Sequence, residues 1–172
     1  MLIKTFESFS LSEYEMIKSY YGNKQATRSQ VPLINHINEG LLILEMIGSS
    51  EYAKRAYCLH PMFQSDDDLI KNYDSNLGIN QRVLINVMEY RYTANSYLSK
   101  RDISGLNDIR ISPLKDVNDM LIADKVQNRK DFELYHLGKH DRSSVLDQYF
   151  KNWLEKLGIS ESQYQSFLEV LK

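Results

Sequence analysis

The sequence predicts an all-α fold, and three observations support that prediction. Prolines and glycines are scarce, 3 and 7 in 172 residues, so few positions interrupt a helix. In most segments apolar residues recur every three or four positions, the period of an amphipathic helix. No segment alternates apolar and polar residues as a half-buried strand would. Without repeats or linkers, we expect one compact helical domain that spans residues 1–172.

Start and stop signals place the helices expected in the first half of the chain. Ser10 and Glu13 have the spacing of a capping box, which satisfies backbone N–H groups at a helix start. Pro32 ends the polar stretch YGNKQATRSQV, and Gly48 ends the apolar helix that follows. The expected helices cover residues 11–21, 33–48, 49–60, 66–73 and 80–98.

The second half begins with the stretch RDISGLNDIRIS, which we expect to be a loop. Pro113 then opens a long helix whose apolar stripe includes Val117 and Leu121. Ser160 and Gln163 form another capping box before the last helix. The expected helices cover residues 113–137, 142–158 and 160–172.

Composition excludes several classes of protein. The net charge of −2 gives no basic excess for nucleic acid, so we expect no nucleic-acid partner. A single cysteine, Cys58, excludes a disulfide framework and fits a reducing compartment. The segment MLIKTFESFS lacks the apolar run of a signal peptide, and no stretch approaches the roughly 18 apolar residues of a membrane span. We expect a cytoplasmic protein without a membrane partner, and a homo-oligomer remains open.

Two histidines and one aspartate stand out as candidate ligands. His36 lies in the middle of an apolar helix, and His60 ends the next one; either alone would be interpreted as a core or capping histidine. Asp124 lies in the stretch LIADKVQNRKDF, where apolar neighbours draw it toward the core. A buried acid needs an arginine, a helix end or a metal ion as partner. Imidazole and carboxylate together suit Zn²⁺, Mn²⁺ or Fe²⁺.

Four segments in order carry a family resemblance, over roughly residues 20–157: KQATRSQVPLINHINEGLLIL, AYCLHPMFQSDDDL, LIADKVQNRKDF and VLDQYFKNWLEKL. They resemble motifs of the RelA/SpoT-type alarmone hydrolases, a small, helical branch of the HD phosphohydrolases. The resemblance implies a compact HD-domain-like helical bundle. It also implies removal of the 3′-pyrophosphate from guanosine alarmones, usually with Mn²⁺.

The resemblance assigns roles to single residues. It makes His36, His60 and Asp124 ligands of a divalent metal, with Mn²⁺ the leading identity and Zn²⁺ or Fe²⁺ as alternatives. For the nucleotide, it makes Arg28 a residue that stacks on the base. Asn128 and Tyr149 become residues that hold the sugar or phosphate. Each has a structural alternative: a solvated loop charge for Arg28, a backbone cap for Asn128 and a core position for Tyr149.

The sequence also departs from the family pattern. Pro61 stands where the family has the aspartate of its His-Asp pair, so one ligand is lost. Gln64 and Ser65 stand where the family has a Glu-Asp pair that orients the attacking water. Gln64 can position a water but cannot take its proton. Asp66 and Asp67 follow directly and are candidate replacements, although they also suit the start of a helix.

Two functions from different classes follow. The first is a divergent metal-dependent phosphohydrolase that acts on a nucleotide phosphate ester, with alarmone 3′-pyrophosphates as the leading substrate class. The second is a catalytically inactive HD-like protein that binds a nucleotide or a protein partner. The enzyme is favoured because His36, His60, Asp124 and Asn128 are all retained.

Overall fold

The computed structural model describes residues 12–27, 29–74, 78–98, 105–139 and 141–171. Every regular element among them is helical, as predicted, and no strand occurs in these ranges; Gln25 and Pro32 form one isolated bridge. The α-helices are α1 Ser12–Tyr21, α2 Ile34–Met46, α3 Glu51–Leu59, α4 Asp66–Asn72, α5 Gln81–Leu98, α6 Lys115–Tyr135, α7 Ser143–Lys156 and α8 Glu161–Val170. Two short 3₁₀ helices, η2 His60–Met62 and η3 Leu106–Asp108, lie between them.

The helix ends follow local chemistry. The capping box predicted at Ser160 and Gln163 is present at the start of α8, and Gly48, with φ of 65°, follows α2. The other predicted box includes Ser10, which lies outside the described residues. One helix was expected over residues 49–60; α3 ends at Leu59, and the chain continues through Pro61 as η2. A proline fits the first turn of a helix because the N–H that it lacks has no partner there.

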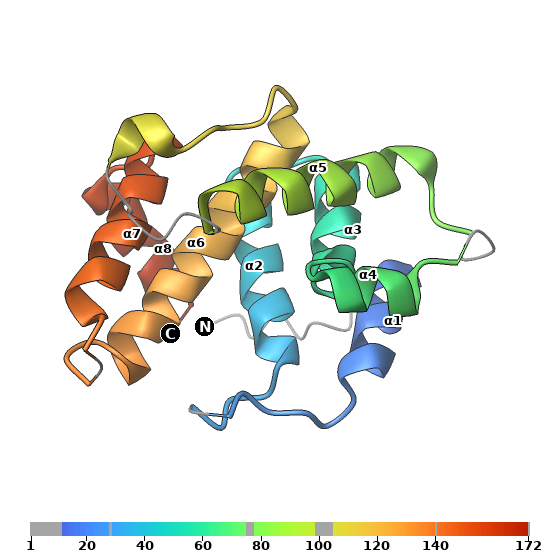
Figure 1. Ribbon diagram of the computed structural model, residues 1–172, viewed down its shortest axis with the longest axis horizontal. Helices are drawn as coiled ribbons and strands as arrows, with labels where there is room; N and C mark the ends of the chain where they lie inside the picture. Colours follow the sequence, from blue (N-terminus) through green and yellow to red (C-terminus); the bar gives the residue numbers. More distant parts are fainter. Residues whose placement is uncertain (1–11, 28, 75–77, 99–104, 140, 172) are drawn as a thin grey trace.

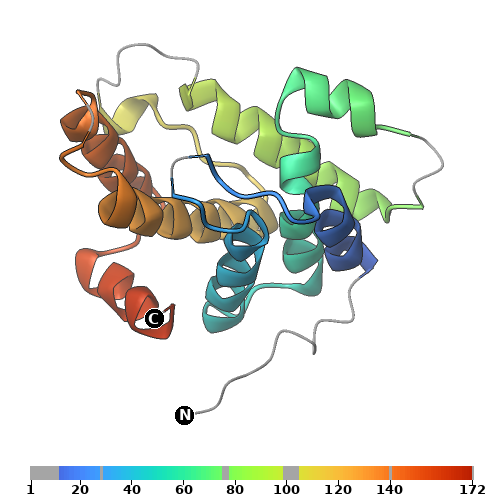
Figure 2. The same cartoon turned by 90° about the horizontal axis from the view of Figure 1, so that it is seen from below.

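Helix α6 is the centre of the bundle. It packs against α2, α3, α5, α7 and α8. Figure 1 shows α6 crossing the molecule between α7 on one side and α2 on the other, with α5 along one edge. Figure 2 shows the same bundle turned by 90°. A side chain in the middle of α6 can therefore meet groups from most of the other helices.

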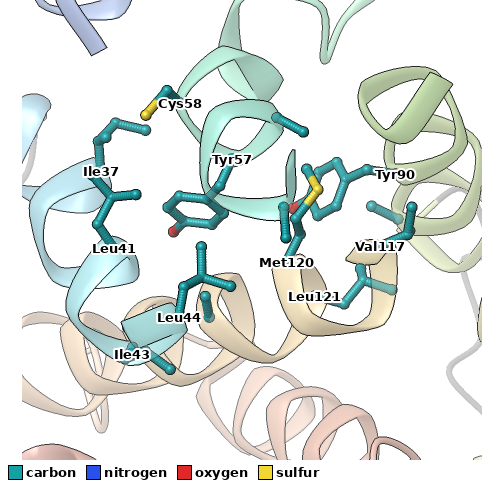
Figure 3. Close-up of a cluster of buried hydrophobic side chains, with 14 of the residues drawn as sticks. Ile37, Leu41, Ile43, Leu44, Tyr57, Cys58, Tyr90, Val117, Met120 and Leu121 are labelled. Carbon is teal, nitrogen blue, oxygen red and sulfur yellow. The ribbon is translucent and has the colours of Figure 1, made fainter. Parts of the chain in front are cut away.

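The apolar core fills the space between α2, α3, α5 and α6 (Figure 3). Its side chains are fully or almost fully buried, and Cys58 is one of them, as expected for a small apolar residue. Tyr57 extends from α3 toward Leu41 and Leu44 on α2 in Figure 3. Burial of such side chains supplies most of the free energy that holds helices together.

Gly40 allows α2 and α3 to pack closely. A Cβ atom at this position would overlap the ring and hydroxyl of Tyr57, so no other residue fits unless that buried ring or the two helices shift. Gly40 is one helical turn after His36 on α2, and Tyr57 is three residues before His60. The same close contact therefore sets the distance between the two histidines.

No helix within the described ranges has both the length and the apolar character needed to cross a membrane.

Candidate metal centre

His36, His60 and Asp124 meet at one point inside the bundle. Their ligand atoms lie within 4.8 Å of one another. The Nε2 atoms of the two imidazoles are 3.2 Å apart. Asp124 Oδ1 lies 3.5 Å from His36 Nε2 and 3.8 Å from His60 Nε2. The residues come from α2, from the end of α3 and from the middle of α6, and the three can hold a metal ion together.

The tautomer of His60 is fixed by the backbone. Its Nδ1 lies 2.7 Å from the carbonyl oxygen of Tyr57. A carbonyl oxygen only accepts hydrogen bonds, so Nδ1 carries the proton and Nε2 carries a lone pair. Burial lowers the pKa of His60 to about 3, and repulsion from His36 adds to the shift when His36 is protonated. His60 is therefore neutral near pH 7, the form in which imidazole binds a metal.

The tautomer of His36 is fixed by a side chain. Its Nδ1 lies 2.6 Å from Gln127 Oε1. Gln127 Nε2 donates to Glu39 and Asp131, at 3.1 and 2.8 Å, so the amide group cannot be assigned the other way round. His36 Nδ1 therefore carries a proton, and in the neutral imidazole Nε2 presents a lone pair.

The result is a set of three acceptors without a shared donor. The two Nε2 lone pairs and Asp124 Oδ1 face one another; His60 and Asp124 are buried, and His36 is partly buried. Atoms about 2.0–2.2 Å from one tetrahedral ion lie about 3.3–3.6 Å apart, close to the separations found here. A divalent cation satisfies all three acceptors at once.

Asp124 stays ionised because of its neighbours. Burial opposes ionisation, but Lys125, joined by the two imidazoles when they are protonated, outweighs it and holds the pKa of Asp124 well below its usual range. Lys125 Nζ donates to Oδ2 at 2.8 Å, and Asn128 donates to Oδ1 at 2.9 Å. Burial disfavours the charge of Lys125, yet Asp124 raises the pKa of Lys125. Both charges are thus retained inside the bundle.

An open cavity of about 520 Å³ borders this cluster. Its walls combine the three ligands with the loop before α2 and with aromatic side chains of α5 and α7. The lining residues are Tyr21, Ala26, Ser29, Val31, Pro32, Leu33, His36, His60, Pro61, Gln64, Tyr90, Ala94, Asp124, Lys125, Gln127, Asn128, Asp131, Leu146, Tyr149 and Phe150. This volume is within the usual range for small-molecule sites.

Of the predicted nucleotide-binding residues, Asn128 and Tyr149 both line the cavity. Tyr149 is buried, stacks on Tyr97 with ring centroids 5.3 Å apart, and has Lys125 Nζ 5.6 Å from its ring centroid. Arg28 lies outside the described residues, so its predicted role stays a prediction. Its neighbours Ala26 and Ser29 line the cavity.

Of the three predicted catalytic residues, one lines the cavity and two do not. Gln64 lines the cavity, where its Nε2 donates to Asn95 Oδ1 at 2.6 Å. Asp66 and Asp67 are exposed in the first turn of α4, and neither lines the cavity. Asp66 pairs with Arg91. The structure therefore does not bring Asp66 or Asp67 to the metal cluster.

Two residues at the centre were not singled out from the sequence. Gln127 orients His36, and Lys125 balances the charge of Asp124. The spacing from Asp124 to Gln127 places both on one face of α6, and the predicted burial of Asp124 required a positive partner. These two signals could have found them.

Comparison with known proteins finds no match among family models, curated proteins or solved structures.

Proposed function

We propose that this protein is a metal-dependent phosphohydrolase that acts on a nucleotide phosphate ester. The observation that carries the proposal is the convergence of two imidazole lone pairs and one carboxylate oxygen beside an open cavity. The motif resemblance to alarmone hydrolases of the HD superfamily points to alarmone 3′-pyrophosphates as the leading substrate class. It also points to Mn²⁺, while two nitrogens and one oxygen suit Zn²⁺ and Fe²⁺ as well.

The donors fit such an ion. Each histidine keeps a proton on Nδ1 through a hydrogen bond and turns Nε2 toward the cluster, as metal-binding histidines usually do. The Tyr57 hydroxyl lies 3.3 Å from His36 Nε2, so a metal ion would replace that contact. Three protein ligands leave a position open for water or substrate. A divalent ion bound there supplies Lewis acidity and lowers the pKa of a coordinated water.

The surrounding residues suit an anionic ester. Because Lys125 balances Asp124, these two groups add no net negative charge at the ligand cluster. Asn128 offers an amide at the same point, and Gln64 offers a polar side chain at the cavity wall. Tyr149 and Phe150 add aromatic surface, which suits an apolar or stacking part of a nucleotide.

A second candidate is a protein that binds a nucleotide without turnover. Pro61 and Gln64 both line the cavity, and neither can accept a proton from water. The carboxylates in the described lining are Asp124, which pairs with Lys125, and Asp131, which pairs with Lys130. A general base is typically worth about 10²–10⁴ in rate, so the enzyme that we propose is a slow one.

The test is a substrate panel with protein purified without chelator or affinity-resin metal. Guanosine and adenosine 3′-pyrophosphates, cyclic dinucleotides, nucleoside triphosphates and NADPH are each incubated with Mn²⁺. The wild type is compared with Asp124→Asn, with His36→Gln as a second ligand variant. Asp119→Asn is the matched control, because Asp119 lies on the same helix but does not line the cavity.

We expect turnover in the wild type and in Asp119→Asn, and none in the two ligand variants. We also expect bound metal to fall by more than the ~10–100-fold typical for loss of a group that merely supports a ligand. Tight nucleotide binding without product would favour the binding protein. If no compound of the panel were bound or converted to product, the nucleotide assignment would be rejected.

A further inference from the structure

We propose that Gln127 is a positioning residue that holds His36 in the tautomer able to bind metal, and that Glu39 and Asp131 hold Gln127 in the required orientation. The inference rests on the metal site of the proposed function, and it concerns residues that the sequence motifs did not single out.

Gln127 is enclosed and fully bonded. Its side chain lies on α6, and the residue is 1% exposed. Its Oε1 accepts from His36 Nδ1 at 2.6 Å. Its Nε2 donates to Glu39 Oε2 at 3.1 Å and to Asp131 Oδ2 at 2.8 Å. These three hydrogen bonds fix one orientation of the amide, with Oε1 toward His36 and Nε2 toward the two acids.

The two carboxylates make the reverse orientation unfavourable. If the amide turned over, Oε1 would face two carboxylate oxygens that cannot donate. Lys130 supports the arrangement from the other side, since its Nζ lies 2.7 Å from Glu39 Oε1 and 3.0 Å from Asp131 Oδ1. Lys130 therefore donates to both acids, Glu39 and Asp131. His36 donates to Gln127, and Gln127 in turn donates to the same two acids.

The alternative tautomer of His36 would be stabilised by a hydrogen bond to His60. With the proton on Nε2, His36 would donate to the lone pair of His60 Nε2, 3.2 Å away. That hydrogen bond would occupy the place of the metal. The same tautomer would turn the Nδ1 lone pair against Gln127 Oε1 at 2.6 Å, which is repulsive. Gln127 thus disfavours the state that competes with the metal.

His60 provides an internal control. Its Nδ1 donates to a backbone carbonyl, that of Tyr57, which no side-chain substitution removes. A change at Gln127 should therefore alter the tautomer of His36 and leave that of His60 unchanged.

The experiment measures two properties of Gln127→Met and the wild type. Nitrogen-15 NMR of the imidazoles in metal-free protein reports each tautomer, and titration with Mn²⁺ or Co²⁺ reports affinity. We expect His36 to carry its proton on Nδ1 in the wild type and on Nε2 in Gln127→Met, with His60 unchanged. Metal affinity should fall about 10–100-fold, the usual range for loss of such a supporting group.

A double variant, Glu39→Gln with Asp131→Asn, tests whether the two carboxylates orient Gln127. It also tests the role of Gln127 if Gln127→Met does not fold. It retains Gln127 but removes the charges that orient it, so we expect a mixture of His36 tautomers and weaker metal binding. Unchanged tautomer and affinity in the folded variant would overturn the inference while leaving the metal site intact. A wild type that binds no metal would instead reject the proposed function, and the tautomers in metal-free protein would still test the role of Gln127.

Discussion

Helix α6 carries two polar clusters, centred on the buried residues Asp124 and Arg129, and they are built in opposite ways. Around Arg129, donors and acceptors match: Nε donates to Glu133 at 2.8 Å, and the two terminal nitrogens donate to Glu161 at 2.8 and 3.0 Å. The guanidinium also lies 3.9 Å from the ring centroid of Tyr164. Around Asp124, two imidazole nitrogens and a carboxylate oxygen face one another as acceptors.

The difference separates a structural cluster from a binding cluster. The Arg129 cluster needs nothing from outside, and it fastens α8 to α6. Arg129 and Glu161 reinforce each other: the bond from Arg129 lowers the pKa of Glu161. In the Asp124 cluster the Tyr57 hydroxyl lies 3.3 Å from His36 Nε2, and Asn128 donates to Asp124 Oδ1. The two imidazole Nε2 atoms nevertheless face each other 3.2 Å apart, and a buried acceptor without a donor is costly. A polar group in a core therefore points to ligand binding only when its contacts leave something unsatisfied.

The largest effect on stability should come from the matched cluster. Arg129→Met removes donors from two carboxylates, and we expect the free energy of unfolding to fall by about 2–3 kcal/mol, since hydrogen bonds to charged groups are worth ~1.5–3 kcal/mol each and Glu161 is partly solvated. Urea unfolding of metal-free protein measures this loss. Arg110→Met, at an exposed arginine, is the control and should change stability by less than about 0.5 kcal/mol.

The same variant tests whether the two clusters are independent. Metal that binds only the folded state adds about 2.7 kcal/mol of stability at 100 times its Kd. That increment should be equal in the wild type and in Arg129→Met. If it disappeared in Arg129→Met, the separation of the clusters would be wrong.

Much of this arrangement follows from sequence alone. Apolar periodicity and few helix breakers predict the helices, and capping signals predict several of their ends. The convergence of His36, His60 and Asp124, predicted from their helical settings and motif order, is present in the structure. An aspartate between apolar neighbours has few ways to stay charged, so its need for partners could be foreseen.

The remainder depends on packing that spacing does not encode. Asp66 and Asp67 follow Gln64 directly, yet Ser65 caps α4 and directs both acids into solvent at the start of that helix. Gln127 contacts His36 and Glu39, which are 91 and 88 residues away in sequence. Such a contact depends on how α2 and α6 cross, which a pattern within either helix does not reveal.

A smaller effect should come from the contact that brings the two histidine-bearing helices together. In Gly40→Ala the new methyl group would overlap the ring of Tyr57, and overpacking typically costs 1–3 kcal/mol. Better helix propensity returns roughly 0.5–1 kcal/mol, so we expect a net loss of about 1–2 kcal/mol. Metal affinity should fall as well, because separation of α2 from α3 moves His36 away from His60.

A double-mutant cycle identifies the cause of that loss. In a Tyr57→Leu background the ring is absent, and Gly40→Ala should become neutral or slightly stabilising. A loss of the same size in both backgrounds would show that the ring contact is not responsible. The metal-dependent part of stability, measured with Mn²⁺ and with chelator, should respond to Gly40→Ala but not to Arg129→Met.

The smallest effect concerns the pH dependence of the matched cluster. The hydrogen bond from Arg129 lowers the pKa of Glu161 below its ordinary value of 4.5. A carboxyl group whose pKa is lower in the folded state stabilises that state fully above the unfolded pKa, and the contribution disappears as the pH falls through the folded pKa. Metal-free wild type should therefore exceed Glu161→Gln in stability at pH 7, and the difference should shrink from about pH 4.5 downward.

The size of this effect is limited because the Glu161 side chain is 59% exposed. An ion pair in that setting is worth at most about 1 kcal/mol and weakens in salt. Urea unfolding at a series of pH values, at low and high salt, measures the difference. Glu169→Gln, at an exposed glutamate on the same helix, is the matched control and should track the wild type throughout. If Glu161→Gln also tracked the wild type at low salt, the bond to Glu161 would add nothing. The attachment of α8 would then rest on its other contacts, which include the hydrogen bond from Tyr164 to Glu133 and the buried ring of Phe167.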